Sequence, residues 1–201
     1  MRFALPASLI LATAPALAFE PGTHGEPTEE TGYVVACNTG ENGDACEIHA
    51  RGAVFMAYAG GPSEPEAMKA VADMEQGAPV TFTADMISMG DVTVEMALNS
   101  VAANPEDPLA PVVQGLQGAW DMAGQEVVVT GLEWLETDVA SYLISMGTAC
   151  SDGVERGALH LSLYQMGGDP FSSICLELVE QGADTVTLRD VATGDEVALT
   201  R

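Results

Sequence analysis

The chain has 201 residues, of which 30 are acidic and only 6 are basic, so its formal net charge at pH 7 is −24. A surface this negative repels nucleic acid and anionic lipid, which excludes both as partners. The acidic residues are scattered along the chain, a pattern that is typical of a solubilising surface but that also suits a cationic partner.

Residues 1–18 are interpreted as a secretory signal peptide. Arg2 supplies a short positive region, an apolar run extends through Leu11, and Ala16-Leu17-Ala18 fits a small-x-small cleavage site. No cysteine follows the apolar run to carry a lipid, so we expect release into the periplasm or the medium. No other segment is apolar for the ~18 residues that a membrane-spanning helix needs.

The chain contains four cysteines: Cys37, Cys46, Cys150 and Cys175. An even number of cysteines in an exported protein predicts two disulfides. Three pairings are possible from the sequence. We favour Cys37–Cys46 with Cys150–Cys175, because each of these pairs falls inside one predicted domain, although the sequence alone does not decide.

The segment CNTGENGDAC, between the first two cysteines, is acidic enough to suggest a metal loop. Aligning Gly43 with the glycine of an EF-hand puts Gly40 in place of a carboxylate and His49 in place of the closing glutamate. A zinc site would need a closer pair of cysteines and two further soft ligands. We therefore predict a disulfide-stapled hairpin, with Asn-Gly and Gly-Asp making the reversal, and no metal.

Two segments lack the pattern of regular structure and divide the chain. Residues 19–32 are rich in Pro, Gly, Thr and Glu and predict a flexible acidic arm, in which the lone His24 would be solvated. Residues 102–115 carry three prolines in seven residues, which should stop both helix and sheet, and they predict a linker. The predicted domains are therefore residues 33–101 and residues 116–201.

The first domain reads as short strands at 33–37, 46–50 and 53–58, a helix over 64–76, and strands at 79–84 and 92–101. Ser63 and Glu66 have the spacing of a capping box at the start of that helix. The order of three strands, helix and two strands resembles the OB-fold barrel, which also places its helix between the third and fourth strands. OB-folds that bind nucleic acid present basic and aromatic faces, which this half lacks, so the resemblance implies no such ligand.

The second domain reads as eight short strands joined by turns, at 118–122, 126–130, 132–136, 140–146, 158–165, 173–179, 185–190 and 196–201. They predict a small closed antiparallel barrel. Its start, Leu116-Gln-Gly-Ala-Trp120, resembles the Gly-x-Trp first strand of lipocalin-like proteins. In that family a basic residue of the last strand stacks on the tryptophan, so the resemblance implies a closing cation–π contact between Trp120 and Arg201. The strands are shorter than those of lipocalins and favour a solid interior over a ligand cup.

The second cysteine pair conflicts with a simple barrel. Cys150 follows the fourth predicted strand and Cys175 lies near the start of the sixth, so a strict up-and-down barrel would put them at opposite ends. Either the loop at 166–170 doubles back, or Cys150 sits on a long loop that crosses the barrel.

The sequence contains no recognisable catalytic motif. His49 and His160 each fall in a strand pattern, where a packed or half-exposed histidine is expected, and there is no nucleophile elbow, zinc-protease helix, Walker loop or dinucleotide-binding glycine pattern. Met86 and Met89 are expected to fill a core rather than bind copper. Carboxylate pairs are expected by coincidence among 30 acids: Glu133 with Glu136, and Asp85 with Asp91. We expect no enzyme, no cofactor and no metal.

The runs LQGAW, GLEW, YLISMGTACSDG, ALHLSLYQMGGDP and SSICLEL resemble exported alphaproteobacterial proteins that have no assigned activity. That resemblance implies context but no mechanism. The fold class expected is mainly β with one helix, in two small domains: an OB-like five-stranded barrel followed by an eight-stranded lipocalin-like barrel.

For function we expect a monomeric periplasmic binding or inhibitory module that presents its acidic surface to a cationic protein or peptide. In architecture alone it resembles the small-barrel inhibitors of proteases and lysozymes. The alternatives are a carrier for a small apolar ligand in the second barrel, motivated by Gly118-Ala-Trp120, and a structural component of the envelope.

Overall fold

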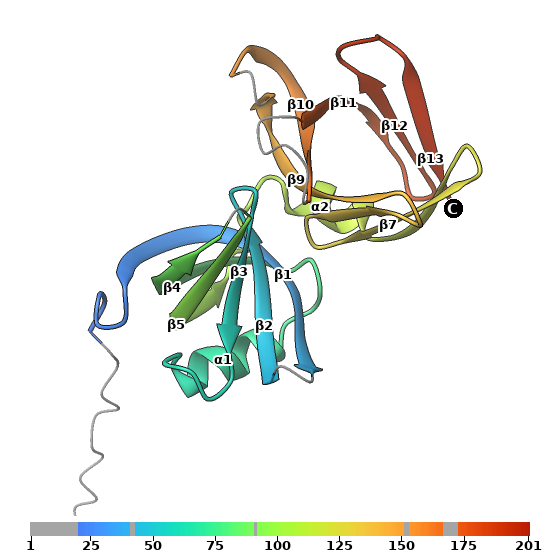
Figure 1. Cartoon of the computed structure of the whole chain (residues 1–201). Helices are drawn as coiled ribbons and strands as arrows, with labels where there is room; N and C mark the ends of the chain where they lie inside the picture. Colours follow the sequence, from blue (N-terminus) through green and yellow to red (C-terminus); the bar gives the residue numbers. More distant parts are fainter. Residues whose placement is uncertain (1–19, 41–42, 91, 151–152, 167–172) are drawn as a thin grey trace, which may run out of the picture.

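The computed structural model describes residues 20–40, 43–90, 92–150, 153–166 and 173–201. It contains two closed β-barrels in succession, with the short helix α2 between them (Figure 1). The two-barrel fold predicted from the sequence is therefore confirmed. The expected signal peptide, residues 1–18, lies outside the described residues.

The first barrel has the strand order β1-β2-β3-β5-β4, and β1 closes it by pairing with β4. β3 and β5 run parallel and the other pairs run antiparallel. Helix α1 lies between β3 and β4 in the chain, as expected of an OB-like barrel, and sits at the end away from the second barrel (Figure 1). The elements are β1 Glu26–Gly40, β2 Gly43–Ala50, β3 Ala53–Tyr58, α1 Pro65–Ala72, β4 Pro79–Met89 and β5 Thr93–Ala103.

The N-terminal segment is not the loose arm that its composition predicts. Residues 26–33 pair one by one with residues 79–86 of β4, and the backbone N–H groups of Gly22 and His24 donate to the Asp85 carboxylate at 2.7 and 2.9 Å. The expectation failed because composition measures side-chain hydrophobicity, whereas this segment is held by backbone bonds to the edge of β4.

Helix α1 is shorter than predicted and has no capping box. It ends at Ala72, because the following Gly77 and Ala78 exchange backbone hydrogen bonds with Val34 of β1. The Ser63 hydroxyl does not cap the helix but accepts the N–H of Leu98 at 3.0 Å. Pro65 fits the first helical turn, where its missing N–H costs nothing.

The second barrel has eight antiparallel strands in sequence order, closed by β13 against β6. The linker before it is partly helical, because Pro111 occupies the first turn of α2, where proline is tolerated. Among the described residues the fold therefore has two helices rather than one. The elements are α2 Ala110–Leu116, β6 Gly118–Met122, β7 Gln125–Thr130, β8 Glu133–Glu136, β9 Ala140–Ala149, β10 Glu155–Gln165, β11 Ser173–Gln181, β12 Thr185–Asp190 and β13 Glu196–Thr200.

The interior of the second barrel is packed with side chains from its strands and from α2. Trp120 is 2% exposed and donates its Nε1–H to the carbonyl of Leu116 at 2.7 Å. The Arg201 guanidinium lies over the Trp120 ring, 3.9 Å from its centroid, and donates to the carbonyls of Gly115 and Gln117. This is the contact that the lipocalin resemblance implied, and it joins Arg201 to the first strand of the second barrel.

Both disulfides have the pairing that the sequence favours. Cys37 and Cys46 face each other across β1 and β2. Cys175 lies opposite Ser162, well inside β10 rather than at the barrel's end, and an irregularity in β10 after Glu155 lets Cys150 reach it over the outer wall. Two disulfides fit a location outside the cytoplasm. Neither helix among the described residues has the length and apolar character that a membrane crossing would need.

Candidate binding site at the junction of the barrels

The second barrel packs against the outward face of strands β1 and β2 of the first barrel. Tyr33, Val34 and Val35 are each less than 7% exposed, so both faces of β1 are buried here. Tyr33 belongs to the hydrophobic core of the second barrel, whereas Val34 belongs to that of the first. OB-folds commonly bind ligands on the face of their second and third strands. In this chain the second barrel occupies part of that region.

His49, at the outward side of β2, is bonded directly to the second barrel. Its ring is 2% exposed and its Nδ1 accepts the backbone N–H of Leu132 at 3.1 Å. The proton of the neutral ring is therefore on Nε2. Burial lowers the pKa of His49 to about 4, so the ring is uncharged at pH 7. With its lone pair already engaged, this histidine is a structural acceptor and is poorly suited to be a general base.

The turn that contains Gly131 and Leu132 contacts the first barrel on one side and the side chain of Gln117 on the other. Gly131 has φ of 59°, and a Cβ there would lie 3.1 Å from Val35 Cγ2 and 3.5 Å from His49 Nδ1. The Gly131 N–H donates to Gln117 Oε1 at 2.7 Å, and Gln117 Nε2 donates back to the Gly131 carbonyl at 3.0 Å. Both the backbone conformation and the close approach of the barrels require glycine here.

A tyrosine and a carboxylate meet beside this junction. The Tyr33 hydroxyl donates to Asp107 Oδ2 at 2.7 Å, and the Leu109 N–H donates to Asp107 Oδ1 at 2.9 Å. Burial, together with the bond to Asp107 and its charge, raises the pKa of Tyr33 well above its usual value. The phenol therefore stays a donor, and the carboxylate of Asp107 is held in a fixed orientation.

These residues line a cleft of about 430 Å³ between the barrels, which is within the usual range of ligand sites. Its walls come from the first barrel, the linker and the second barrel. The residues that line it include Tyr33, His49, Asp107, Leu109, Ser145 and Met146.

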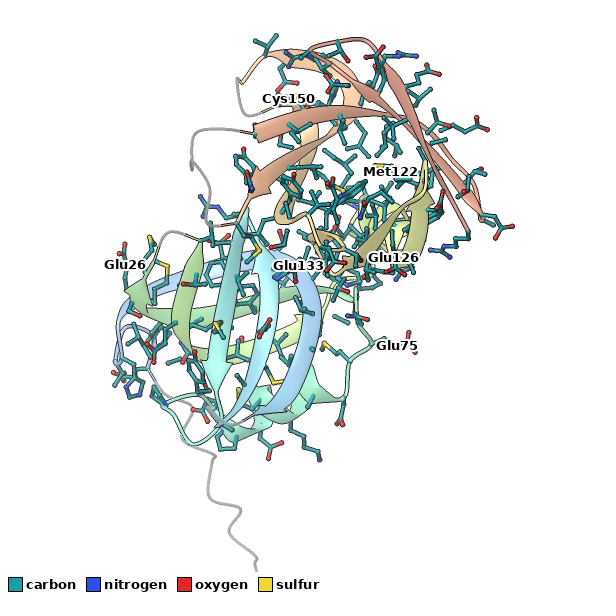
Figure 2. The ribbon with its side chains drawn as sticks, turned by 45° about the vertical axis from the view of Figure 1, so that its right-hand side comes forward. Glu26, Glu75, Met122, Glu126, Glu133 and Cys150 are labelled. Carbon is teal, nitrogen blue, oxygen red and sulfur yellow. A yellow bond between two sulfur atoms is a disulfide. The ribbon has the colours of Figure 1, made fainter. Side chains whose placement is uncertain are left out.

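Within the described part of the chain, two charged residues line the cleft, the acid Asp107 and the base Arg51. Arg51 Nη1 lies 2.6 Å from Glu30 Oε1, which partly offsets its charge, and the Arg51 side chain is 74% exposed. Glu133 lies at the junction (Figure 2), and both its burial and the charge of Glu47 on the other barrel raise its pKa. A cation that enters the cleft would be attracted by the Asp107 carboxylate.

The residues predicted as notable from the sequence lie elsewhere. The disulfide cysteines, Trp120 and Arg201 do not line the cleft. Sequence analysis missed Tyr33 and Asp107, and it identified His49 only as a packed residue. One signal was present: the continuous apolar run Tyr33-Val34-Val35 departs from strict alternation, and such a run indicates a strand that is buried on both faces.

Comparison of the chain with protein-family models, with curated proteins and with solved structures found no match. The cleft therefore has to be interpreted from its own geometry. It offers an oriented carboxylate, hydroxyl groups and apolar walls, which is a set of groups suited to binding.

Proposed function

We propose that the protein is a periplasmic binding or inhibitory module that receives a basic side chain of a partner protein or peptide in the cleft between its barrels. The observation that carries this proposal is the position of Asp107, a carboxylate oriented by two hydrogen bonds inside a cleft formed by both barrels. The cleft belongs to a chain with 30 acidic and 6 basic residues.

Three of the arginines make contacts within the chain. Arg51 pairs with Glu30, and Arg201 lies over Trp120. Arg189 bridges Glu177 and Glu196 at 3.0 and 2.8 Å. The remaining excess of carboxylates gives a negative field that increases the rate at which cationic partners arrive, most strongly at low salt.

The dimensions and chemistry of the cleft suit a lysine or arginine side chain. The apolar atoms of Leu109 and Met146 line it, and the methylene stem of a basic residue packs well against such groups. Asp107 would receive the charged head in a charge-assisted hydrogen bond, the stronger kind. The outer acidic surface would increase the association rate and make binding dependent on salt, but it would not provide specificity.

The alternative of an apolar-ligand carrier gains less support. Trp120, Trp134 and Leu116 are each at most 2% exposed and belong to one contact cluster within the second barrel. A structural envelope component would need no oriented carboxylate in a cleft, so a test of Asp107 separates that alternative from ours.

Fluorescence anisotropy with labelled basic peptides tests the proposal. A panel of short peptides carrying one central lysine or arginine is titrated with the full chain at low and at high salt. We expect at least one peptide to bind, more weakly at high salt, and Asp107→Asn to weaken it about tenfold, as expected for one charged hydrogen bond.

Asp195→Asn is the matched control, because it removes the same charge from the turn between β12 and β13. We expect that variant to bind like the wild type. Equal weakening by both substitutions would show that the peptides sense only overall charge, and the cleft would then lose its proposed role.

A further inference from the structure

A second group of chemically capable residues lies on the outer wall of the second barrel. Leu161 of β10 and Leu176 of β11 face the barrel core, so their neighbours His160 and Cys175 face outward. Cys150, which follows β9, reaches the same place (Figure 2). The two cysteine sulfurs and one ring nitrogen of His160 all lie within 4.8 Å of one another.

The hydrogen bonding of His160 leaves one ring nitrogen with a lone pair that could bind a metal. Its Nδ1 lies 2.9 Å from the carbonyl of Ala158, and because a carbonyl can only accept, Nδ1 must carry the proton. In the neutral ring the lone pair is then on Nε2. Metal-binding histidines commonly have this arrangement, in which the second nitrogen is fixed by a backbone carbonyl. His160 is 2% exposed, so its orientation is also constrained by packing.

Two surface hollows give access to the cluster. One, of about 530 Å³, is lined by both cysteines and by Asp190. The other, of about 210 Å³, is lined by His160 and Glu177. Arg156 lines both hollows. A reductant and an ion can therefore approach the disulfide from the surface.

We propose that Cys150, Cys175 and His160 form a redox-gated site for Cu(I). A dithiol reductant transfers two electrons and two protons to the disulfide and becomes a cyclic disulfide, which leaves two cysteine thiols. Cu(I) then replaces both thiol protons, which pass to solvent, and binds two thiolates and His160 Nε2. Thiolates select soft ions, and three donors suit Cu(I) better than Zn(II), whose structural sites use four.

Anaerobic titration of the full chain tests this proposal. The protein is reduced with dithiothreitol, desalted and titrated with Cu(I) against the chromogenic chelator bicinchoninate. We expect one Cu(I) per reduced chain and none in the oxidised chain. X-ray absorption of the reduced wild-type complex should show two sulfur donors and one nitrogen donor, a result that needs no variant to fold.

Variants locate the site. His160→Gln should weaken Cu(I) about tenfold or more, whereas His24→Gln, on the first barrel, should not. Cys37→Ser with Cys46→Ser should retain the ion, and Cys150→Ser with Cys175→Ser should lose it. A reduced chain that retains no Cu(I), or a His160→Gln variant with unchanged Cu(I) affinity, would overturn the proposal. So would an absorption spectrum that shows only sulfur donors, or a four-coordinate Zn(II) complex that is tighter than the Cu(I) complex.

Discussion

Leu132 and His49 belong to different barrels and share one hydrogen bond, from the Leu132 backbone N–H to His49 Nδ1 at 3.1 Å. The bond requires an uncharged ring, because a protonated imidazole has no lone pair to accept it. The attachment of the two barrels is therefore sensitive to acid.

We predict that stability falls as the pH is lowered from about 6.5 to about 4. The pKa of His49 is about 4 in the folded chain, so across this interval the unfolded chain takes up a proton that the folded chain does not. The loss is on the order of 3 kcal/mol by linkage. Urea unfolding at a series of pH values measures it, and His49→Gln should flatten the dependence.

Other groups at the junction modify this response. The raised pKa of Glu133 acts in the opposite direction, because the folded chain takes up its proton first and is stabilised as the pH falls through that pKa. Glu47, Asp107 and Arg51 also face this region, and Tyr33 remains a neutral phenol. The Glu133→Gln variant should therefore show a steeper loss in acid than the wild type. A wild-type stability that is flat between pH 6.5 and 4.5 would contradict this prediction.

Gly131→Ala should loosen the junction. The substitution places a Cβ in a left-handed conformation, which costs ~1–2 kcal/mol, and presses it against Val35. Gly124→Ala is a matched control in the same barrel, because Gly124 also has positive φ but has open space around it. Denaturant unfolding should show a larger loss for Gly131→Ala. Equal losses would mean that the contact with the first barrel contributes nothing.

Asp85→Asn should release the N-terminal segment. Asp85 is fully buried and accepts the N–H groups of Gly22 and His24 and the side-chain N–H of Asn99. Burial alone would raise its pKa, but these hydrogen bonds hold the pKa below its usual value.

In Asp85→Asn the side-chain NH₂ group would face backbone N–H groups that now donate to the carboxylate. We expect this loss of acceptors to cost about 2–3 kcal/mol. Hydrogen exchange of residues 20–32 should become faster in Asp85→Asn and not in Asp73→Asn, which changes an exposed aspartate. Unchanged exchange in both variants would show that the strand pairing alone holds the segment.

Arg201→Ala should open the end of the second barrel. The substitution removes the cation–π contact with Trp120 and two side-chain bonds to carbonyls, which together contribute about 2 kcal/mol. Arg189→Ala removes two solvent-screened ion pairs and should cost less than Arg201→Ala does. Tryptophan emission should shift to longer wavelength only in the Arg201 variant. A loss no larger than that of Arg189→Ala would contradict the closing role.

Much of the fold could be predicted because local patterns determine it. Alternating apolar residues located most of the strands, and Gly118-Ala-Trp120 with a basic C-terminal residue indicated the contact between Trp120 and Arg201. The same reasoning failed for residues 26–32, whose strand depends on the edge of β4 rather than on their own side chains. It also failed for Pro111, which lies in the first turn of a helix instead of preventing one.

The candidate site was less accessible to prediction because its parts are distant in sequence. Tyr33 and Asp107 lie 74 residues apart and meet only after the barrels have packed together. Likewise His49 and Leu132 are 83 residues apart. Each looked unremarkable in its own segment, since a buried histidine in a strand is usually a packing residue and an aspartate between prolines is usually part of a turn.

An NMR titration of the isotope-labelled chain with a lysine- or arginine-containing peptide tests the central proposal most directly. We expect the shifted backbone signals to gather on both sides of the junction, at Gly32, Arg51, Asp107 and Ser145, and to weaken in Asp107→Asn. Shifts spread evenly over the acidic surface, or confined to one barrel, would contradict a binding site between the two.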